Sequence, residues 1–107
     1  MDAQDDVARF CESHDLDGEP AYRILDLAAE VGEVAADAAK SAEYGDAPDQ
    51  LTVSEDEIGD ALFSLLAAAN ALDVDAGAAL ETAMDKYERR LTETGSAGSG
   101  DAAAENS

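Results

Sequence analysis

This chain of 107 residues is poor in several residue types, and each shortage excludes a class of protein. It contains a single cysteine, Cys11, so neither a disulfide framework nor a cysteine-based metal site is expected. No apolar run approaches the roughly 18 residues that a membrane-spanning helix needs. The N-terminus is acidic, which is not typical of a signal peptide. We therefore expect a cytoplasmic protein that does not bind membranes.

Positive charge is equally scarce. Six lysine and arginine residues stand against 26 aspartate and glutamate residues, for a formal net charge of −20. Direct binding to nucleic acid needs a basic surface that neutralises phosphates, so we expect none here. The acids are spread along the whole chain, which favours a halophilic protein from a salt-rich cytoplasm. A surface for a basic partner is the alternative explanation.

Large aromatic side chains are few as well: the chain has no tryptophan, three tyrosines and two phenylalanines. Alanine is abundant instead, so we expect a thin core in a chain whose size already makes burial marginal. Association with another copy of the chain would supply the missing burial, so a homo-oligomer is expected. A single domain is predicted over residues 1–93. The Gly-, Ser- and Ala-rich residues 94–107 are predicted to form a disordered acidic tail.

What the chain does have is helical periodicity. Apolar residues recur at the 3.6-residue period in four segments, and no strand pattern competes with them. The predicted helices span residues 2–13, 20–44, 54–72 and 75–92. From Ala61 to Leu72 the third helix is apolar nearly all round, so we expect it to be buried nearly all round. The predicted fold is an all-α, four-helix bundle-like protomer.

Two tetrapeptides within the second and third helices are near copies of each other: Glu30-Val31-Gly32-Glu33 and Glu57-Ile58-Gly59-Asp60. Carboxylates three positions apart share one face of a helix. The short connection between the helices lets them lie antiparallel, with the two motifs at similar depth. Four carboxylates in one small space repel one another unless a cation lies between them. Each motif also contains a glycine, which costs about 1 kcal/mol in a helix interior and suggests a close approach of backbone or ligand there.

The type of donor indicates which metal is expected. The four candidate ligands are carboxylates, with no histidine or cysteine near them in sequence: Glu30, Glu33, Glu57 and Asp60. Oxygen-only sites suit Mg²⁺, Mn²⁺ or Ca²⁺ rather than zinc. Because Mg²⁺ commonly completes its coordination shell with substrate phosphates, the pattern points to a phosphorylated substrate, with nucleoside di- or triphosphates as the leading class. Acidic pairs with this spacing are frequent in so acidic a chain, and a solvated surface is the alternative interpretation.

Three further residues are candidates for substrate binding. Lys86 and Arg90 lie near the end of the fourth predicted helix, where phosphate contact is one interpretation. The other is a stabilising effect on the helix alone, because cations at a helix C-terminus interact favourably with its dipole. Asn70, in an otherwise apolar stretch, is either a polar tie between helices or a contact with the substrate.

The two acidic segments resemble a known family. Residues 27–37 (LAAEVGEVAAD) and residues 56–63 (DEIGDALF) are similar to the MazG-type nucleotide pyrophosphohydrolases, an all-α family with the pattern Glu-x-x-Glu, a spacer, then Glu-x-x-Asp. Many members carry a further glutamate where this chain has Ala29. The residues that match the family's metal ligands are Glu30, Glu33, Glu57 and Asp60. The resemblance also favours substrate contact over a polar tie for Asn70.

The resemblance implies Mg²⁺-dependent hydrolysis of a nucleoside triphosphate to the monophosphate and pyrophosphate, with Mn²⁺ as a possible substitute. Members usually work as dimers or dimers of dimers, often to clear non-canonical or surplus nucleotides. Within this scheme Glu33 is our candidate for the catalytic carboxylate that orients or deprotonates the attacking water. Phosphoribosyl-ATP pyrophosphohydrolase is a related alternative. A non-catalytic acidic helical module that binds a basic partner, and an inactive relative that senses nucleotides, are alternatives from other classes.

Overall fold

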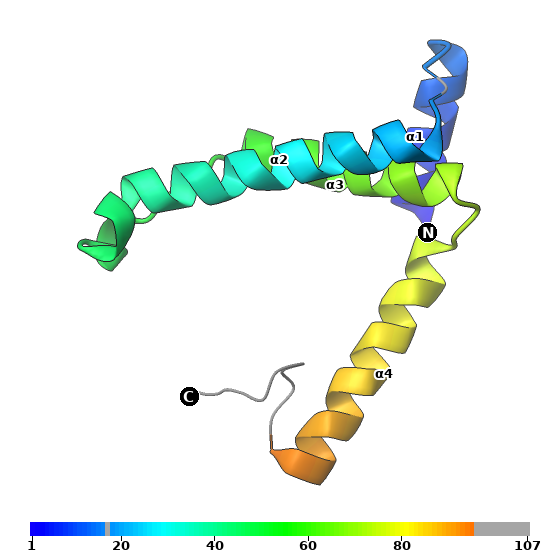
Figure 1. Ribbon diagram of the computed structural model, residues 1–107. Helices are drawn as coiled ribbons and strands as arrows, with labels where there is room; N and C mark the ends of the chain where they lie inside the picture. The colour runs from blue at the N-terminus through cyan, green and yellow to red at the C-terminus, as the bar shows by residue number, and fades with distance from the viewer. Residues whose placement is uncertain (17, 96–107) are drawn as a thin grey trace. The chain divides into compact units, whose positions relative to one another are not determined.

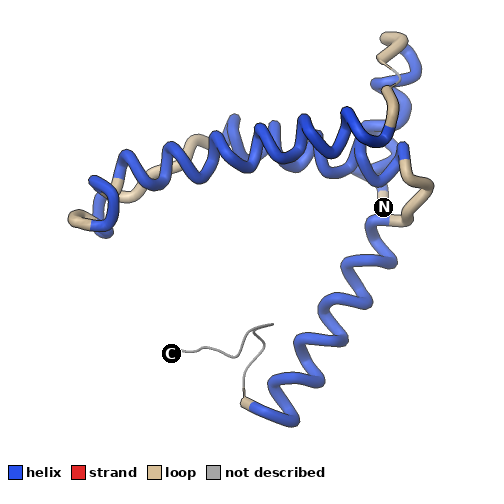
Figure 2. Tube along the Cα trace, in the orientation of Figure 1, coloured by secondary structure: helices blue, strands red, loops and turns tan. Residues whose placement is uncertain are grey.

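Figure 1 shows the computed structural model of the protein, which describes residues 1–16 and 18–95. These residues form helices and loops without a strand (Figure 2), which confirms the predicted all-α class. The elements are α1 (Asp2–Ser13), α2 (Pro20–Ser41), the short 3₁₀ turns η1 (Glu43–Gly45) and η2 (Pro48–Gln50), α3 (Glu55–Ala71) and α4 (Ala76–Thr94). The chain divides into two compact units at residues 74 and 75. The single domain over residues 1–93 stays a prediction, and residues 96–107 of the predicted tail lie outside the described residues.

Helix α2 is shorter than the predicted helix over residues 20–44. Pro20 lies in its first turn, where the missing backbone N–H does no harm. The helix ends at Ser41, and φ is 52° at Glu43 and 56° at Tyr44. These left-handed values cannot continue a right-handed helix. The Ser41 hydroxyl donates to the carbonyl of Thr52 at 3.0 Å and accepts from its N–H at 2.7 Å, which joins the end of α2 to the segment before α3.

Helices α2 and α3 lie side by side and run in opposite directions (Figure 1). The chain leaves α2 at Ser41, reverses through η1 and η2, and returns along α2 as α3. This is the antiparallel arrangement that the short connection predicts. It places the helix that carries Glu30 and Glu33 beside the helix that carries Glu57 and Asp60.

Ser54 begins α3 as predicted. Its Oγ accepts a hydrogen bond from the backbone N–H of Glu57 at 3.1 Å, so one of the N–H groups in the first turn has a partner.

We expect Ser54→Ala to lower the free energy of unfolding by about 1 kcal/mol, because the N–H of Glu57 loses its acceptor. Ser54→Thr keeps a hydroxyl in the same place and is the matched control. Urea denaturation followed by circular dichroism measures both variants. Equal unfolding free energies for the alanine and threonine variants would show that this cap does not stabilise the protein.

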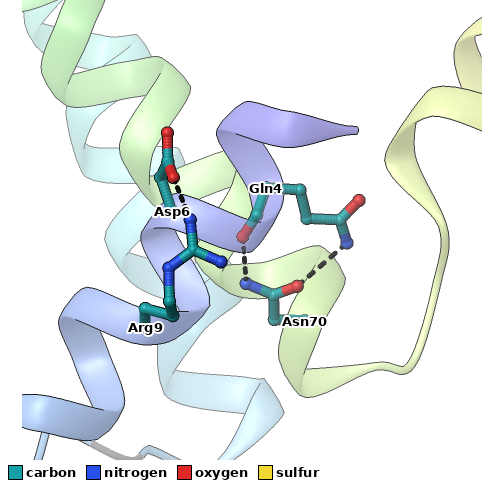
Figure 3. A network of polar contacts seen from close by, with 4 residues as sticks. All are labelled: Gln4, Asp6, Arg9 and Asn70. Atoms are coloured by element: carbon teal, nitrogen blue, oxygen red, sulfur yellow. Dashed lines mark hydrogen bonds and ion pairs between the residues drawn. The ribbon is translucent and has the colours of Figure 1, made fainter.

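Helix α1 packs against α3 at two levels. The rings of Phe10 and Phe63 meet edge to face, with centroids 5.9 Å apart, a geometry that aromatic pairs favour. Nearer the end of α3, the side chain of Gln4 is only 7% exposed, and its Nε2 donates to Asn70 Oδ1 at 2.9 Å and to the carbonyl of Val74 at 2.7 Å. Asn70 Nδ2 donates in return to the Gln4 carbonyl at 3.2 Å (Figure 3). Asn70 is therefore a polar tie between α1 and α3, the first of its two predicted roles.

The hydrophobic core is thin, as the alanine-rich composition predicts. The buried residues of α3 are Leu66, Ala67, Ala68 and Ala69. Within the unit of residues 1–74, α3 is not buried nearly all round as expected, because Ile58, Leu62 and Leu65 are 52%, 50% and 48% exposed. Within residues 1–74, α1 and α2 cover only part of its circumference.

Helix α4 belongs to the second unit. Asp75 Oδ1 accepts from the backbone N–H of Ala78 at 3.0 Å and caps its first turn, which confirms the predicted start. The helix ends two residues later than predicted, where Gly95 adopts φ 76°, the left-handed conformation that glycine provides without steric cost.

Among the described residues no single helix is long and apolar enough to cross a membrane. Helices α3 and α4, counted together as one span with a bend between them, meet the criterion of length and composition.

Candidate functional site

The acidic residues of the two motifs lie on adjacent helices of one compact unit. Glu30 and Glu33 belong to the middle of α2, and Glu57 and Asp60 to the first two turns of α3. Residues three or four positions apart share a helical face, so each helix presents its pair on one side. Asp37 follows Glu33 by four positions and extends the acidic face of α2 by one turn.

The pKa shifts show that these carboxyl groups interact across the two helices. The pKa of Glu57 is raised to about 7, first by a hydrogen bond to the carboxyl group of Asp37, then by partial burial and by the negative charges of Asp37, Glu33 and Asp60. Partial burial also raises the pKa of Glu30, followed by the charges of Glu33, Asp60 and Asp26. Each group responds to charges on both helices. The raised pKa values of Glu30 and Glu57 therefore reflect negative charges on both helices. That the four carboxylates bind a metal stays a prediction.

Asp37 is the residue of this site that the sequence prediction missed. A hydrogen bond between two carboxyl groups requires one of them to keep its proton, which is why the contact with Asp37 raises the pKa of Glu57. The sequence does contain a signal, because Asp37 lies on the same helical face as Glu30 and Glu33. Asp37 was missed because it lies outside the four-residue motif, which ends at Glu33.

The donors suit a hard divalent cation. The Oε1 atom of Glu57 is buried and has no hydrogen-bond partner, and a buried polar atom without a partner is energetically costly. A cation would satisfy it, and an all-carboxylate donor set matches the preference of Mg²⁺ and Mn²⁺ for oxygen. No group of three or more acidic, histidine or cysteine side chains within residues 1–16 and 18–95 has the arrangement to hold an ion. The side chains would have to close around it, since like charges repel one another.

The glycines of the two motifs were predicted to allow a close approach of backbone or of a ligand, and the structure tests the first of these. A Cβ atom added at Gly32 or at Gly59 would meet no atom within 4 Å. The expected close approach of backbone is therefore wrong for both glycines within this chain.

The predicted substrate-binding residues lie elsewhere in the chain. Asn70 follows Asp60 by ten residues, which corresponds to about 15 Å along α3, and its side chain is bonded to Gln4. Lys86 and Arg90 belong to α4 and thus to the second unit, where Lys86 Nζ lies 5.0 Å from the centroid of the Tyr87 ring. Substrate contact by these three residues stays a prediction.

The raised pKa of Glu57 predicts how stability depends on pH. Because its pKa is about 7 in the folded protein against 4.5 ordinarily, the stability that it contributes is fully present below pH 4.5 and is lost as the pH rises through 7. We expect the Tm in chelator to fall between about pH 5 and about pH 8, and Glu57→Gln to reduce that fall. Glu55→Gln removes one charge from the same turn and is the matched control. A fall of equal size in wild type and Glu57→Gln would contradict this prediction.

Comparison with known proteins gives one match. Residues 20–94 match the family model described as MazG nucleotide pyrophosphohydrolase domain, a range that takes in α2, α3 and α4 and both acidic motifs. No curated protein and no solved structure matches the chain significantly.

Proposed function

The chain belongs to the MazG nucleotide pyrophosphohydrolase domain family, and from this premise we propose that it hydrolyses nucleoside or deoxynucleoside triphosphates to the monophosphate and pyrophosphate, with Mg²⁺ or, in its place, Mn²⁺. The observation that carries this proposal is the shared negative field of the two helices, with the buried and unpartnered Oε1 of Glu57 within it. Carboxyl groups whose negative charges raise one another's pKa gain from a bound cation and from a phosphorylated ligand that carries the cation.

The residues that would hold the divalent ions are Glu30, Glu33, Glu57 and Asp60. When bound, such ions neutralise the phosphate oxygens and make the α-phosphorus more electrophilic. Glu33 would orient the attacking water by a hydrogen bond and accept its proton. Asp37, which shares a hydrogen bond with the carboxyl group of Glu57, would help to position that side chain. The new bond joins the water oxygen to the α-phosphorus, the bond from the α-phosphorus to the bridging oxygen breaks, and pyrophosphate leaves.

We further propose that the protein acts as a homodimer or homotetramer in a salt-rich cytoplasm, where it removes non-canonical or surplus nucleotides. The half-exposed apolar residues of α3 support association, as does a similar row on α4 that includes Leu80 and Leu91, 51% and 54% exposed. Light scattering coupled to gel filtration distinguishes the monomer, dimer and tetramer.

The activity is tested by incubating the purified protein with canonical and modified nucleoside triphosphates, with Mg²⁺ or with a chelator. Chromatography of the nucleotides and a coupled assay for pyrophosphate give the products. We expect monophosphate and pyrophosphate in equal amounts, and only with metal. Turnover of phosphoribosyl-ATP alone would favour the related alternative. Binding without turnover would favour a nucleotide sensor, and the absence of both would contradict the proposed function.

A further inference from the structure

A cavity of about 530 Å³, largely open to solvent, lies where the end of α2 meets the segment before α3. Small-molecule sites commonly measure roughly 300–1,000 Å³, so a cavity of this size is large enough for a ligand. Its lining residues are Asp37, Lys40 and Ser41 of α2, and Thr52, Val53 and Ser54 of the segment before α3. All except Val53 carry polar or charged side chains, which suits a polar ligand.

Two lining residues connect this cavity to the acidic faces. Asp37 lines it and is hydrogen-bonded to the carboxyl group of Glu57. Ser54 lines it as well, and its Oγ accepts the backbone N–H of Glu57 at 3.1 Å. Two residues that line the cavity, Asp37 and Ser54, therefore also contact Glu57, the first at its carboxyl group and the second at its backbone N–H.

Lys40 is the cation of this cavity. It is the only lysine or arginine among the lining residues, and its side chain is exposed. The ion pair that the structure gives within residues 1–16 and 18–95 joins Arg9 to Asp6 on α1 (Figure 3), so Lys40 forms no ion pair, although Asp37 lies three positions before it on α2 and lines the same cavity. Although the chain has a net charge of −20, a lysine that forms no ion pair and lies beside a polar cavity is available to bind an anionic ligand.

We propose that this cavity binds the β- and γ-phosphates of the nucleotide, with Lys40 Nζ as their positively charged partner; the inference rests on the proposed function. The α-phosphate then lies at the acidic faces with the divalent cation, and the two distal phosphates extend past Glu57 into the cavity. The hydroxyl of Ser54, whose oxygen accepts the N–H of Glu57, keeps its own proton to donate to a phosphate oxygen. Negative charge grows on the departing pyrophosphate as its bond to the α-phosphorus breaks, and a fixed cation beside it stabilises that charge.

The test uses inorganic pyrophosphate with Mg²⁺ as the probe, measured by isothermal titration calorimetry on the full chain. We expect Lys40→Met to weaken binding about tenfold or more, and Lys40→Arg to retain most of it, because a charged hydrogen-bond donor is lost in the first variant and kept in the second. Arg9→Met removes the same charge from α1 and is the matched control, expected to bind like wild type. Mn²⁺ binding without pyrophosphate, followed by electron paramagnetic resonance, is expected to be as tight in Lys40→Met as in wild type.

Two results would overturn the inference: pyrophosphate binding by Lys40→Met as tight as by wild type, or no binding by wild type in the presence of Mg²⁺. In the nucleotide assay Lys40→Met is expected to raise KM, because phosphate binding is weakened, and to lower kcat, because the charge on the departing pyrophosphate loses its cation. These measurements distinguish failure of the proposed activity from failure of the proposed role of Lys40. A wild type that binds pyrophosphate but cleaves no nucleotide contradicts the proposed function alone, whereas an active wild type whose Lys40→Met variant is unchanged contradicts the role of Lys40 alone.

Discussion

Replacing Glu57 or Asp60 by alanine is expected to lower kcat/KM for pyrophosphate release by more than about 100-fold, since even residues that only support metal ligands commonly contribute 10–100-fold. Each variant removes one of the four carboxylates that share the negative field between α2 and α3. The helices should persist, because the buried residues of α3 lie further along it, from Leu66 to Ala69. Steady-state release of pyrophosphate measures the loss, and circular dichroism verifies the helix content.

Asp56→Ala provides the matched control for these variants. Asp56 lies in the same first turn of α3 and is exposed, and it is not among the charges that raise the pKa of Glu57 or Glu30. We expect its activity to remain close to that of wild type. Full activity in either the Glu57 or the Asp60 variant would show that the reaction does not take place at this site.

Raising KCl from about 0.1 M to about 2 M is expected to raise the Tm by more than about 10 °C, since each 1 kcal/mol of added stability raises the Tm of a small domain by roughly 4–8 °C. The physical reason is the formal net charge of −20 on a chain of 107 residues. The Debye length shortens from about 10 Å at 0.1 M to about 3 Å at 1 M, so repulsion among exposed acids is screened. Thermal unfolding followed by circular dichroism measures the change.

The control for the salt effect is a variant with fewer exposed acids. Glu12, Glu81 and Glu88 are all exposed, and their replacement by glutamine removes three negative charges. This variant should have a higher Tm at low salt than wild type and a smaller rise with KCl. A Tm that falls as KCl is added to wild type would contradict both this prediction and the proposed salt-rich cytoplasm.

The sequence by itself determined the features that depend on neighbouring residues along one helix. Helices α3 and α4 begin at the predicted positions, where Ser54 and Asp75 cap them, because capping joins a side chain to an N–H three residues ahead in the same segment. Apolar periodicity predicted the four helices for the same reason, and the paired motifs of α2 and α3 were sufficient to indicate the family.

Only the tertiary structure decided the features that depend on contacts between segments. It joined the end of α2 to Thr52 through two hydrogen bonds of the Ser41 hydroxyl, placed Asp37 against Glu57, and used Asn70 to hold α1. Each of these contacts depends on the register in which two helices or loops meet. Periodicity states which face of a helix is apolar or acidic, but it does not state which residue on a second element lies opposite, because that is set by packing over the whole unit.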